Sequence, residues 1–163
     1  MDFIEINSIL FSGKRSFPWK KVEEYLSKYS GSIVTIKETG ERIIIGSHFA
    51  SEYCGSKYTR NLHGSVEKAK ANAVQILPDL IREATNRRWV DNKDKKHGND
   101  AKNGWYRYDV HFSMLVVFDG KVTRNYYRGT LIARINDMGI YAHDIINIKK
   151  EDSEPFESQD RTV

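Results

Sequence analysis

The 163-residue sequence lacks the features that mark several protein classes. It has one cysteine, Cys54, so no disulfide can form within the chain, and no histidine or acidic residues surround it at a familiar zinc spacing. It also has no apolar stretch long enough for a secretory signal or a membrane span. We therefore expect no metal, no cofactor, no membrane association and a cytoplasmic location, with Cys54 as a small buried side chain.

The sequence has slightly fewer acidic than basic residues, and its charges are unevenly distributed along the chain. The net charge is +4, yet residues 151–163 hold five acids against one base, so the preceding part is more basic than the total indicates. A basic surface favours polyanionic partners, although an ordinary solvated surface has the same composition. With 39% hydrophobic and 29% charged residues, we expect a single folded domain over residues 1–150 and a disordered acidic tail over 151–163.

The hydrophobic pattern of the first half predicts helices and one hairpin. Apolar residues recur at helical spacing in FPWKKVEEYLSKYSG, and again over residues 65–86, where Pro78 should divide the helix into 65–77 and 78–86. Two β-branched runs flank a turn and predict an extra β-hairpin at about residues 32–45.

The second half predicts a sheet. Residues 87–104 are nearly all polar and are expected to form a long mobile loop. Three β-rich runs follow, separated by DGK and NDMG, and predict an antiparallel meander. The expected fold class is therefore α+β, with N-terminal helices packed on a C-terminal antiparallel β-meander.

The run WYRYDVHF, which begins at residue 105, alternates apolar and polar side chains. In a strand this pattern separates a core face, with Tyr106, Tyr108, Val110 and Phe112, from a polar face. If the meander pairs in register, the polar face gathers Arg107, His111, Arg128, Thr130 and His143. Imidazoles beside guanidinium groups are what metal-independent RNA cleavage needs: a base, an acid and cations near the phosphorus. A sheet with one solvated face shows the same pattern without any function.

Other candidates lie outside the strands. His97 and Lys102 belong to the basic loop, where neither packing nor a strand constrains them. The SKYT run offers Lys57 and Tyr58 as phosphate contacts near a helix N-terminus.

Three stretches resemble a known family: EYCGSKYTRNLHGSVEKAKANA, KKHGNDAKNGWYRYDVHF and YRGTLIARINDMGIYAHDIINIKKE. The family is the large polyvalent protein-associated domains of gut Firmicutes, their phages and conjugative elements, linked to the barnase, EndoU, colicin and RelE class of nuclease folds (BECR). The similarity covers roughly residues 20–150. It implies helices packed on a four-stranded antiparallel sheet and the activity of a metal-independent endoribonuclease with its site on the sheet face.

The resemblance also ranks the candidate residues. Family members share the SKYT segment, a histidine in the basic loop, the GWYRYD block and a terminal YxxDIINIKKE pattern. This implies a role for His97, Arg107 and Tyr108, and it argues against His48 and His63.

Two main functions stay open on this evidence, and a third and weaker alternative is a purely structural or interaction domain of a larger phage protein. The first is an RNA-cleaving bacterial toxin or mobile-element effector, delivered into a target cell, with RNA such as tRNA as substrate and an immunity or antitoxin protein as partner. Its catalytic residues would be His97, Arg107, His111 and Arg128, and its substrate-binding residues Lys57, Tyr58, Lys102, Tyr108, Thr130 and His143. The second is a non-catalytic accessory domain of a phage or conjugative-element protein that binds nucleic acid or protein through the same face.

Overall fold

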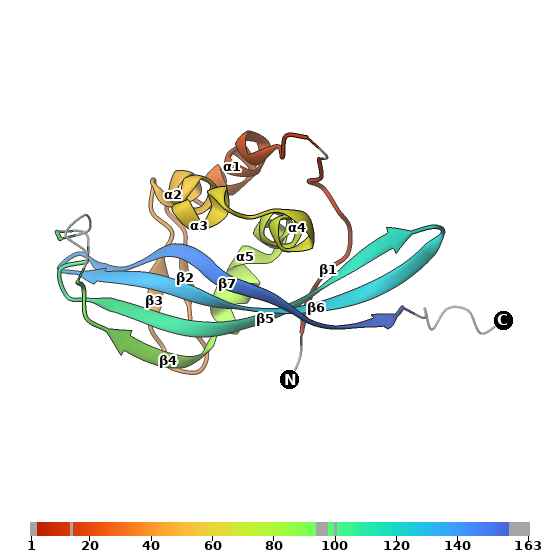
Figure 1. Ribbon diagram of the computed structural model, residues 1–163. Coiled ribbons are helices and arrows are strands. Elements are labelled where there is room, and N and C mark those ends of the chain that lie inside the picture. The colour runs from red at the N-terminus through yellow and green to blue at the C-terminus, as the bar shows by residue number, and fades with distance from the viewer. Residues whose placement is uncertain (1–2, 14, 94–97, 100, 157–163) are drawn as a thin grey trace.

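The computed structural model describes residues 3–13, 15–93, 98–99 and 101–156. In chain order its elements are β1 (Ile4–Ile6), α1 (Trp19–Ser27), β2 (Ile33–Thr35), β3 (Arg42–Ile44), α2 (Phe49–Gly55), α3 (Lys57–Arg60), α4 (Gly64–Asn72), the 3-10 helix η1 (Ala73–Ile76), α5 (Leu77–Arg82), β4 (Thr85–Val90), β5 (Trp105–Phe118), β6 (Lys121–Asn136) and β7 (Gly139–Pro155). The helices lie together on one face of a twisted sheet (Figure 1). The α+β class is thus confirmed.

The helices largely follow the predicted pattern. Helix α1 buries Val22 and Leu26, which lie on one side of its amphipathic surface. The long helical segment is divided as expected, because Pro78 occupies the first turn of α5, where its missing N–H costs no helical hydrogen bond. None of the helices within the described ranges is long and apolar enough to cross a lipid bilayer.

The predicted meander is confirmed as the centre of the sheet. Strands β5, β6 and β7 pair antiparallel, with His111 opposite Arg128 and Arg128 opposite Lys149. The β5–β6 turn places Asp119 and Gly120 at φ values of 52° and 74°, as a two-residue hairpin loop requires. The β5–β6 hairpin extends beyond the helical layer (Figure 1). The hairpin expected at 32–45 is also present, as β2 paired antiparallel with β3.

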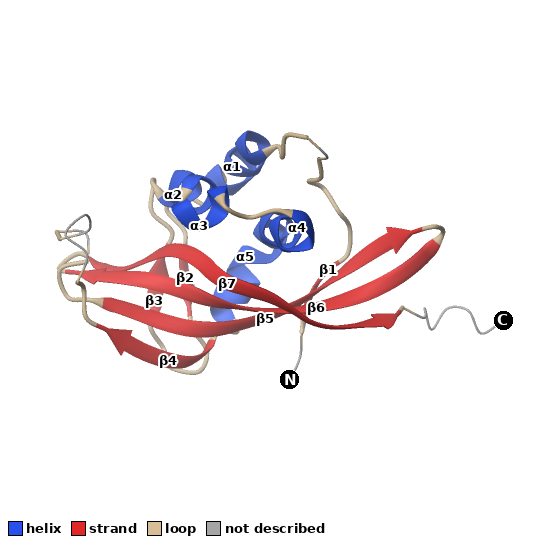
Figure 2. Cartoon of the chain, in the orientation of Figure 1, coloured by secondary structure: helices blue, strands red, loops and turns tan. Residues whose placement is uncertain are grey.

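The sheet is larger and more mixed than the four-stranded antiparallel one that the resemblance implies. Its seven strands within the described ranges run in the order β1-β5-β6-β7-β3-β2, with β4 also paired to β5. Strand β1 joins β5 in parallel, and β3 joins β7 in parallel at Ile140 and Tyr141 (Figure 2). These added strands have three residues each, too few for alternation to be recognised in the sequence.

Strand β4 corrects two predictions, because it occupies the end of the expected helix 78–86 and the start of the expected loop 87–104. Helix α5 ends at Arg82, whose carbonyl accepts a hydrogen bond from the Lys37 amide at 3.0 Å. The chain then pairs with the outer edge of β5, where Arg88 lies opposite Arg107. Tertiary pairing therefore outweighs the polar local composition of this segment.

The core lies between the helices and the face of β5, β6 and β7 that the helices cover. The predicted core face of β5 is confirmed, since Tyr108, Val110 and Phe112 are buried. Phe112 stacks on Tyr127 of β6 with ring centroids 5.3 Å apart. Cys54 is buried here as expected, and this burial raises the pKa of its thiol to about 12.

The acidic segment after residue 150 begins as a strand, which corrects part of the disordered-tail prediction. Residues 151–155 continue β7 and pair with β6. Glu154 accepts hydrogen bonds from Arg124 at 3.2 Å and from the Tyr126 hydroxyl at 2.6 Å, so the basic and aromatic residues of β6 hold the acids in place. Residues 157–163 lie outside the described part of the chain.

Candidate nucleic-acid interface

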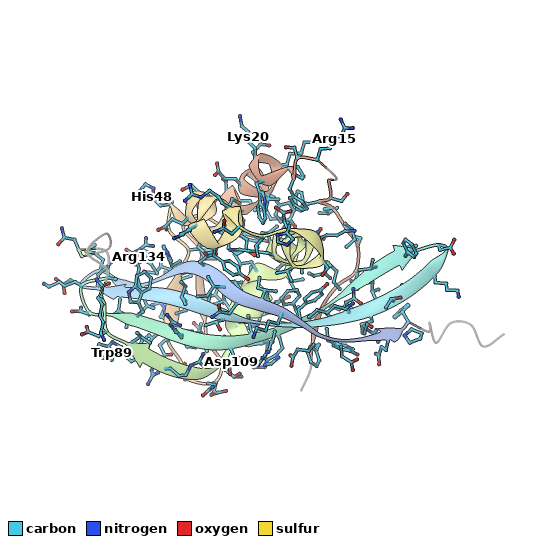
Figure 3. The ribbon with its side chains drawn as sticks, in the orientation of Figure 1. Arg15, Lys20, His48, Trp89, Asp109 and Arg134 are labelled. Carbon is cyan, nitrogen blue, oxygen red and sulfur yellow. The ribbon has the colours of Figure 1, made fainter. Side chains whose placement is uncertain are left out.

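The sheet face opposite the helices carries two neighbouring cavities. Figure 3 shows Asp109 on this face, away from His48 on the helical side. The first cavity has a volume of about 500 Å³ and is here called the basic cavity. Strands β4 to β7 supply its lining residues: Arg88, Asp109, His111, Arg128, Gly129, Thr130, Asn147 and Lys149.

Strand register explains why these residues meet. Asp109 and His111 point away from the core because their neighbours on β5 point into it. They face Thr130 and Arg128 across the β5–β6 ladder, and Lys149 lies opposite Arg128 on β7. The predicted grouping of His111, Arg128 and Thr130 on one face is therefore observed.

A bulge in β7 shapes one wall of the basic cavity. The β6–β7 register shifts between Arg128 and Thr130, and Asn147 adopts a positive φ of 53° in this stretch. The intervening β6 residue is Gly129, where an added Cβ would lie 3.2 Å from the side chains of Ile145 and Ile148. The bulge turns Asn147 and Lys149 toward the cavity.

The charges around the basic cavity are mainly positive. Among the described residues, its lining holds three basic side chains but a single carboxylate, Asp109, which accepts hydrogen bonds from Arg88 at 3.0 Å and Asn86 at 2.9 Å. Glu151 stands farther away, 3.8 Å from His111 Nδ1 and about 4.0 Å from Arg128 Nε. The Arg88 and Arg128 side chains are 39% and 54% exposed, so solvent screens these pairs and each contributes only about 0–1 kcal/mol. An incoming anion can therefore compete for these cations.

The second cavity, here called the Trp105 cavity, has a volume of about 370 Å³. It is lined by Val90, Asp91, Asn92, Lys93, Trp105, Arg107, Ile132 and His143. The Trp105 indole N–H donates to Asn92 at 3.3 Å, and the ring meets His143 edge-on at 5.1 Å. Within the described residues, the buried Nε of Arg107 has no hydrogen-bond partner. Arg107 and His143 thus lie on the predicted open face but not in the basic cavity.

His143 contacts helix α2. Its Nδ1 lies 3.0 Å from Glu52, which also accepts a 2.9 Å hydrogen bond from Arg134. Burial acts to raise the pKa of Glu52, but the hydrogen bonds and charges of His143 and Arg134 outweigh it and hold that pKa below its usual value. This engagement with Glu52 sets His143 apart from His111.

The remaining predicted site residues that the structure describes do not line either cavity. Tyr108 points into the core and donates a hydrogen bond to Glu41 at 2.9 Å, and its pKa is raised by burial. Lys57 is exposed on α3, and Lys102 pairs with Asp137 at 3.0 Å. His97 lies outside the described residues.

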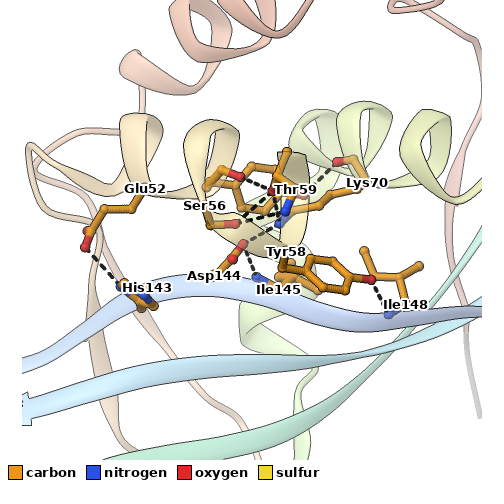
Figure 4. A network of polar contacts seen from close by, with 10 residues as sticks. Glu52, Ser56, Tyr58, Thr59, Lys70, His143, Asp144, Ile145 and Ile148 are labelled. Carbon is orange, nitrogen blue, oxygen red and sulfur yellow. Dashed lines mark hydrogen bonds and ion pairs between the residues drawn. The ribbon is translucent and has the colours of Figure 1, made fainter. Parts of the chain in front are cut away.

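The SKYT segment is hydrogen-bonded to the sheet from the helical side. The Tyr58 hydroxyl accepts a 2.8 Å hydrogen bond from the Ile148 amide, next to the β7 bulge (Figure 4). Thr59 accepts a 2.6 Å hydrogen bond from Lys70, which in turn forms a 2.5 Å ion pair with Asp144 of β7 (Figure 4). This buried network fixes β7 directly behind the basic cavity.

Sequence reasoning missed two cations of the basic cavity. Arg88 falls in the segment that is expected to form a loop, where alternation predicts no face. Alternation predicts Tyr141, His143, Ile145 and Asn147 on one face of the last strand, and Lys149 continues this face into the cavity, but Ile145 is buried between the β7 bulges. A single inserted residue leaves no recognisable signal in one sequence.

Within the described residues, no three histidine, cysteine or acidic side chains lie close enough together to hold a metal ion. Comparison with protein-family models, with curated proteins and with solved structures found no match to this chain.

Proposed function

We propose that this chain binds single-stranded RNA on the open face of its sheet, with backbone phosphate in the basic cavity. The observation that carries this proposal is the convergence of Arg88, Arg128 and Lys149 from three strands on one cavity, whose lining among the described residues has Asp109 as its only carboxylate. Guanidinium groups match the oxygens of phosphate in a two-pronged geometry, and Thr130 adds a neutral hydroxyl. Most contacts between proteins and nucleic acids are made to the backbone in this way.

Cleavage of the bound RNA is a second candidate function, favoured by the position of His111. Its imidazole lines the basic cavity directly across from Arg128. There it can accept the proton of a 2′-hydroxyl while the guanidinium stabilises the charge that develops on the phosphoryl oxygens. The leaving oxygen needs a proton from a second group, for which the sequence offers His97. This reaction is that of a BECR-type endoribonuclease, and a toxin or effector role with an immunity partner would follow from it.

The binding proposal is tested by fluorescence anisotropy with a labelled single-stranded RNA in the presence of EDTA. If each of the three cations neutralises one phosphate, the logarithm of the binding constant should fall against the logarithm of the salt concentration with a slope of about −2. The substitutions Arg128→Ala and Lys149→Ala should each make that slope shallower by about 0.7. Lys102→Ala is the matched control, because it removes an exposed cation outside both cavities. Equal effects of the control and the cavity variants would contradict the proposal.

Cleavage is tested separately with the same RNA and EDTA. The wild-type protein should release fragments ending in a 2′,3′-cyclic phosphate, and His111→Ala should abolish the release while binding persists. If the protein binds the RNA but the RNA stays intact, the binding function stands and the catalytic function is refuted.

A further inference from the structure

We propose that the Trp105 cavity holds a nucleobase of the same RNA strand whose phosphate occupies the basic cavity. This inference rests on the proposed function and gives it a second subsite. It assigns the open face two ligand chemistries, a phosphate at one end and a planar heterocycle at the other.

The two cavities adjoin along strand β5. Arg107 lines the Trp105 cavity, and Asp109, two residues later on the same face, lines the basic cavity. Residues two apart in a strand are about 7 Å apart, so adjacent rows of side chains line the two sites. Arg88, the β4 residue of the basic cavity, also lies directly opposite Arg107 of β5. A nucleotide can span this separation between its phosphate and its base.

The lining of the Trp105 cavity fits a base better than a second phosphate. Val90, Trp105 and Ile132 provide apolar walls, and an indole ring offers a stacking surface that accepts any nucleobase. The volume of about 370 Å³ lies near the lower end of the range for small-ligand cavities, as a single heterocycle requires. Two further lining residues, Lys93 and Asp91, carry opposite charges.

Arg107 supplies the polar contact that such a ligand needs. Its Nε is buried and has no hydrogen-bond partner among the described residues, and a buried donor in this state is costly. Arg107 also lines the cavity, where the carbonyl oxygens and ring nitrogens of nucleobases are acceptors for the N–H groups of its guanidinium. A ribose or an aliphatic side chain would leave either the apolar wall or this donor without a suitable partner.

The test compares two labelled oligomers of equal length and charge, one RNA and one abasic ribose-phosphate strand. Stacking of a single base predicts that the wild-type protein binds the RNA about tenfold more tightly than the abasic strand. Trp105→Ala should remove this preference and leave the affinity for the abasic strand unchanged, whereas Trp105→Phe should retain most of it. Arg107→Lys, which keeps the charge but removes the Nε donor, should reduce the preference as well.

The outcomes separate this inference from the proposed function. Equal binding of the two oligomers by the wild-type protein would refute the base subsite while the phosphate site stands. Binding of neither oligomer would refute both. Arg128→Ala should weaken both oligomers equally, and retained abasic binding shows that each Trp105 or Arg107 variant is folded. A Trp105→Ala variant that keeps the full preference would also overturn the inference.

Discussion

The buried ion pair between Lys70 and Asp144 yields the sharpest stability prediction. Their side chains are 0% and 3% exposed, and the Nζ–Oδ1 distance is 2.5 Å. Lys70 also donates to Thr59 and lies 4.5 Å from the centre of the Tyr53 ring, while Asp144 accepts from the Ile145 amide at 2.8 Å. Burial lowers the pKa of Lys70 and raises the pKa of Asp144, which shows that both charges are strongly desolvated.

The predicted magnitudes follow from this geometry. Lys70→Met leaves a buried carboxylate without its cation, and Asp144→Asn leaves a buried ammonium without its anion, so each should lower the free energy of unfolding by about 3–5 kcal/mol. The double variant removes both desolvated charges. We therefore expect it to cost less than the sum of the two single effects, with a coupling of at least about 2 kcal/mol.

The assay is urea unfolding followed by circular dichroism near neutral pH. Domains of this size have an unfolding free energy of about 5–15 kcal/mol, so the single variants should show clearly lower midpoints. Lys37→Met is the matched control, because Lys37 and Glu83 form a 3.1 Å ion pair with side chains 64% and 42% exposed. Its cost should stay below about 1 kcal/mol. Single effects as small as the control, or effects that simply add, would refute the reasoning.

Three further predictions concern other parts of the molecule. The pKa of Glu52 is lowered in the folded state, so its contribution to stability is present above the unfolded pKa and is lost as the pH falls below about 4.5; Glu52→Gln should flatten the acid limb of a stability–pH curve. Tyr58→Phe removes the acceptor of the Ile148 amide and should cost about 1–3 kcal/mol in urea unfolding and weaken RNA binding in the anisotropy assay. Cys54, whose pKa is about 12, should not react with a thiol reagent at pH 8 until the protein is unfolded, and rapid labelling of the native protein would contradict its burial.

The central meander could be predicted because its signal is long and local. Strand β5 alternates over many residues, and the DG turn fixes how it pairs with β6. Strands β1 and β4 could not be predicted in the same way, since each is short and is stabilised by its pairing with β5. Their stability is a property of the finished sheet and leaves little trace in local composition.

The residues of the candidate site could be predicted only where the strands pair in regular register. His111, Arg128 and Thr130 share the basic cavity because β5 and β6 pair without a shift in this region. On β7, bulges change which residues face outward, so Ile145 is buried although alternation places it on the outer face beside His143 and Lys149. Alternation alone assumes an unbroken ladder, and the prediction failed where the ladder is broken.

The short pairing of β3 with β7 has a consequence for association between copies of the chain. Because β3 pairs with β7 only at Ile140 and Tyr141, the described part of the chain offers no strand to cover the outer edge of β7 from residue 142 onward. An uncovered strand edge can add a strand from another molecule and start aggregation. Here the edge carries a run of four charged residues, 149–152, which disfavours growth of the sheet at this edge. Neutralising this run would therefore promote aggregation as well as weaken the basic cavity.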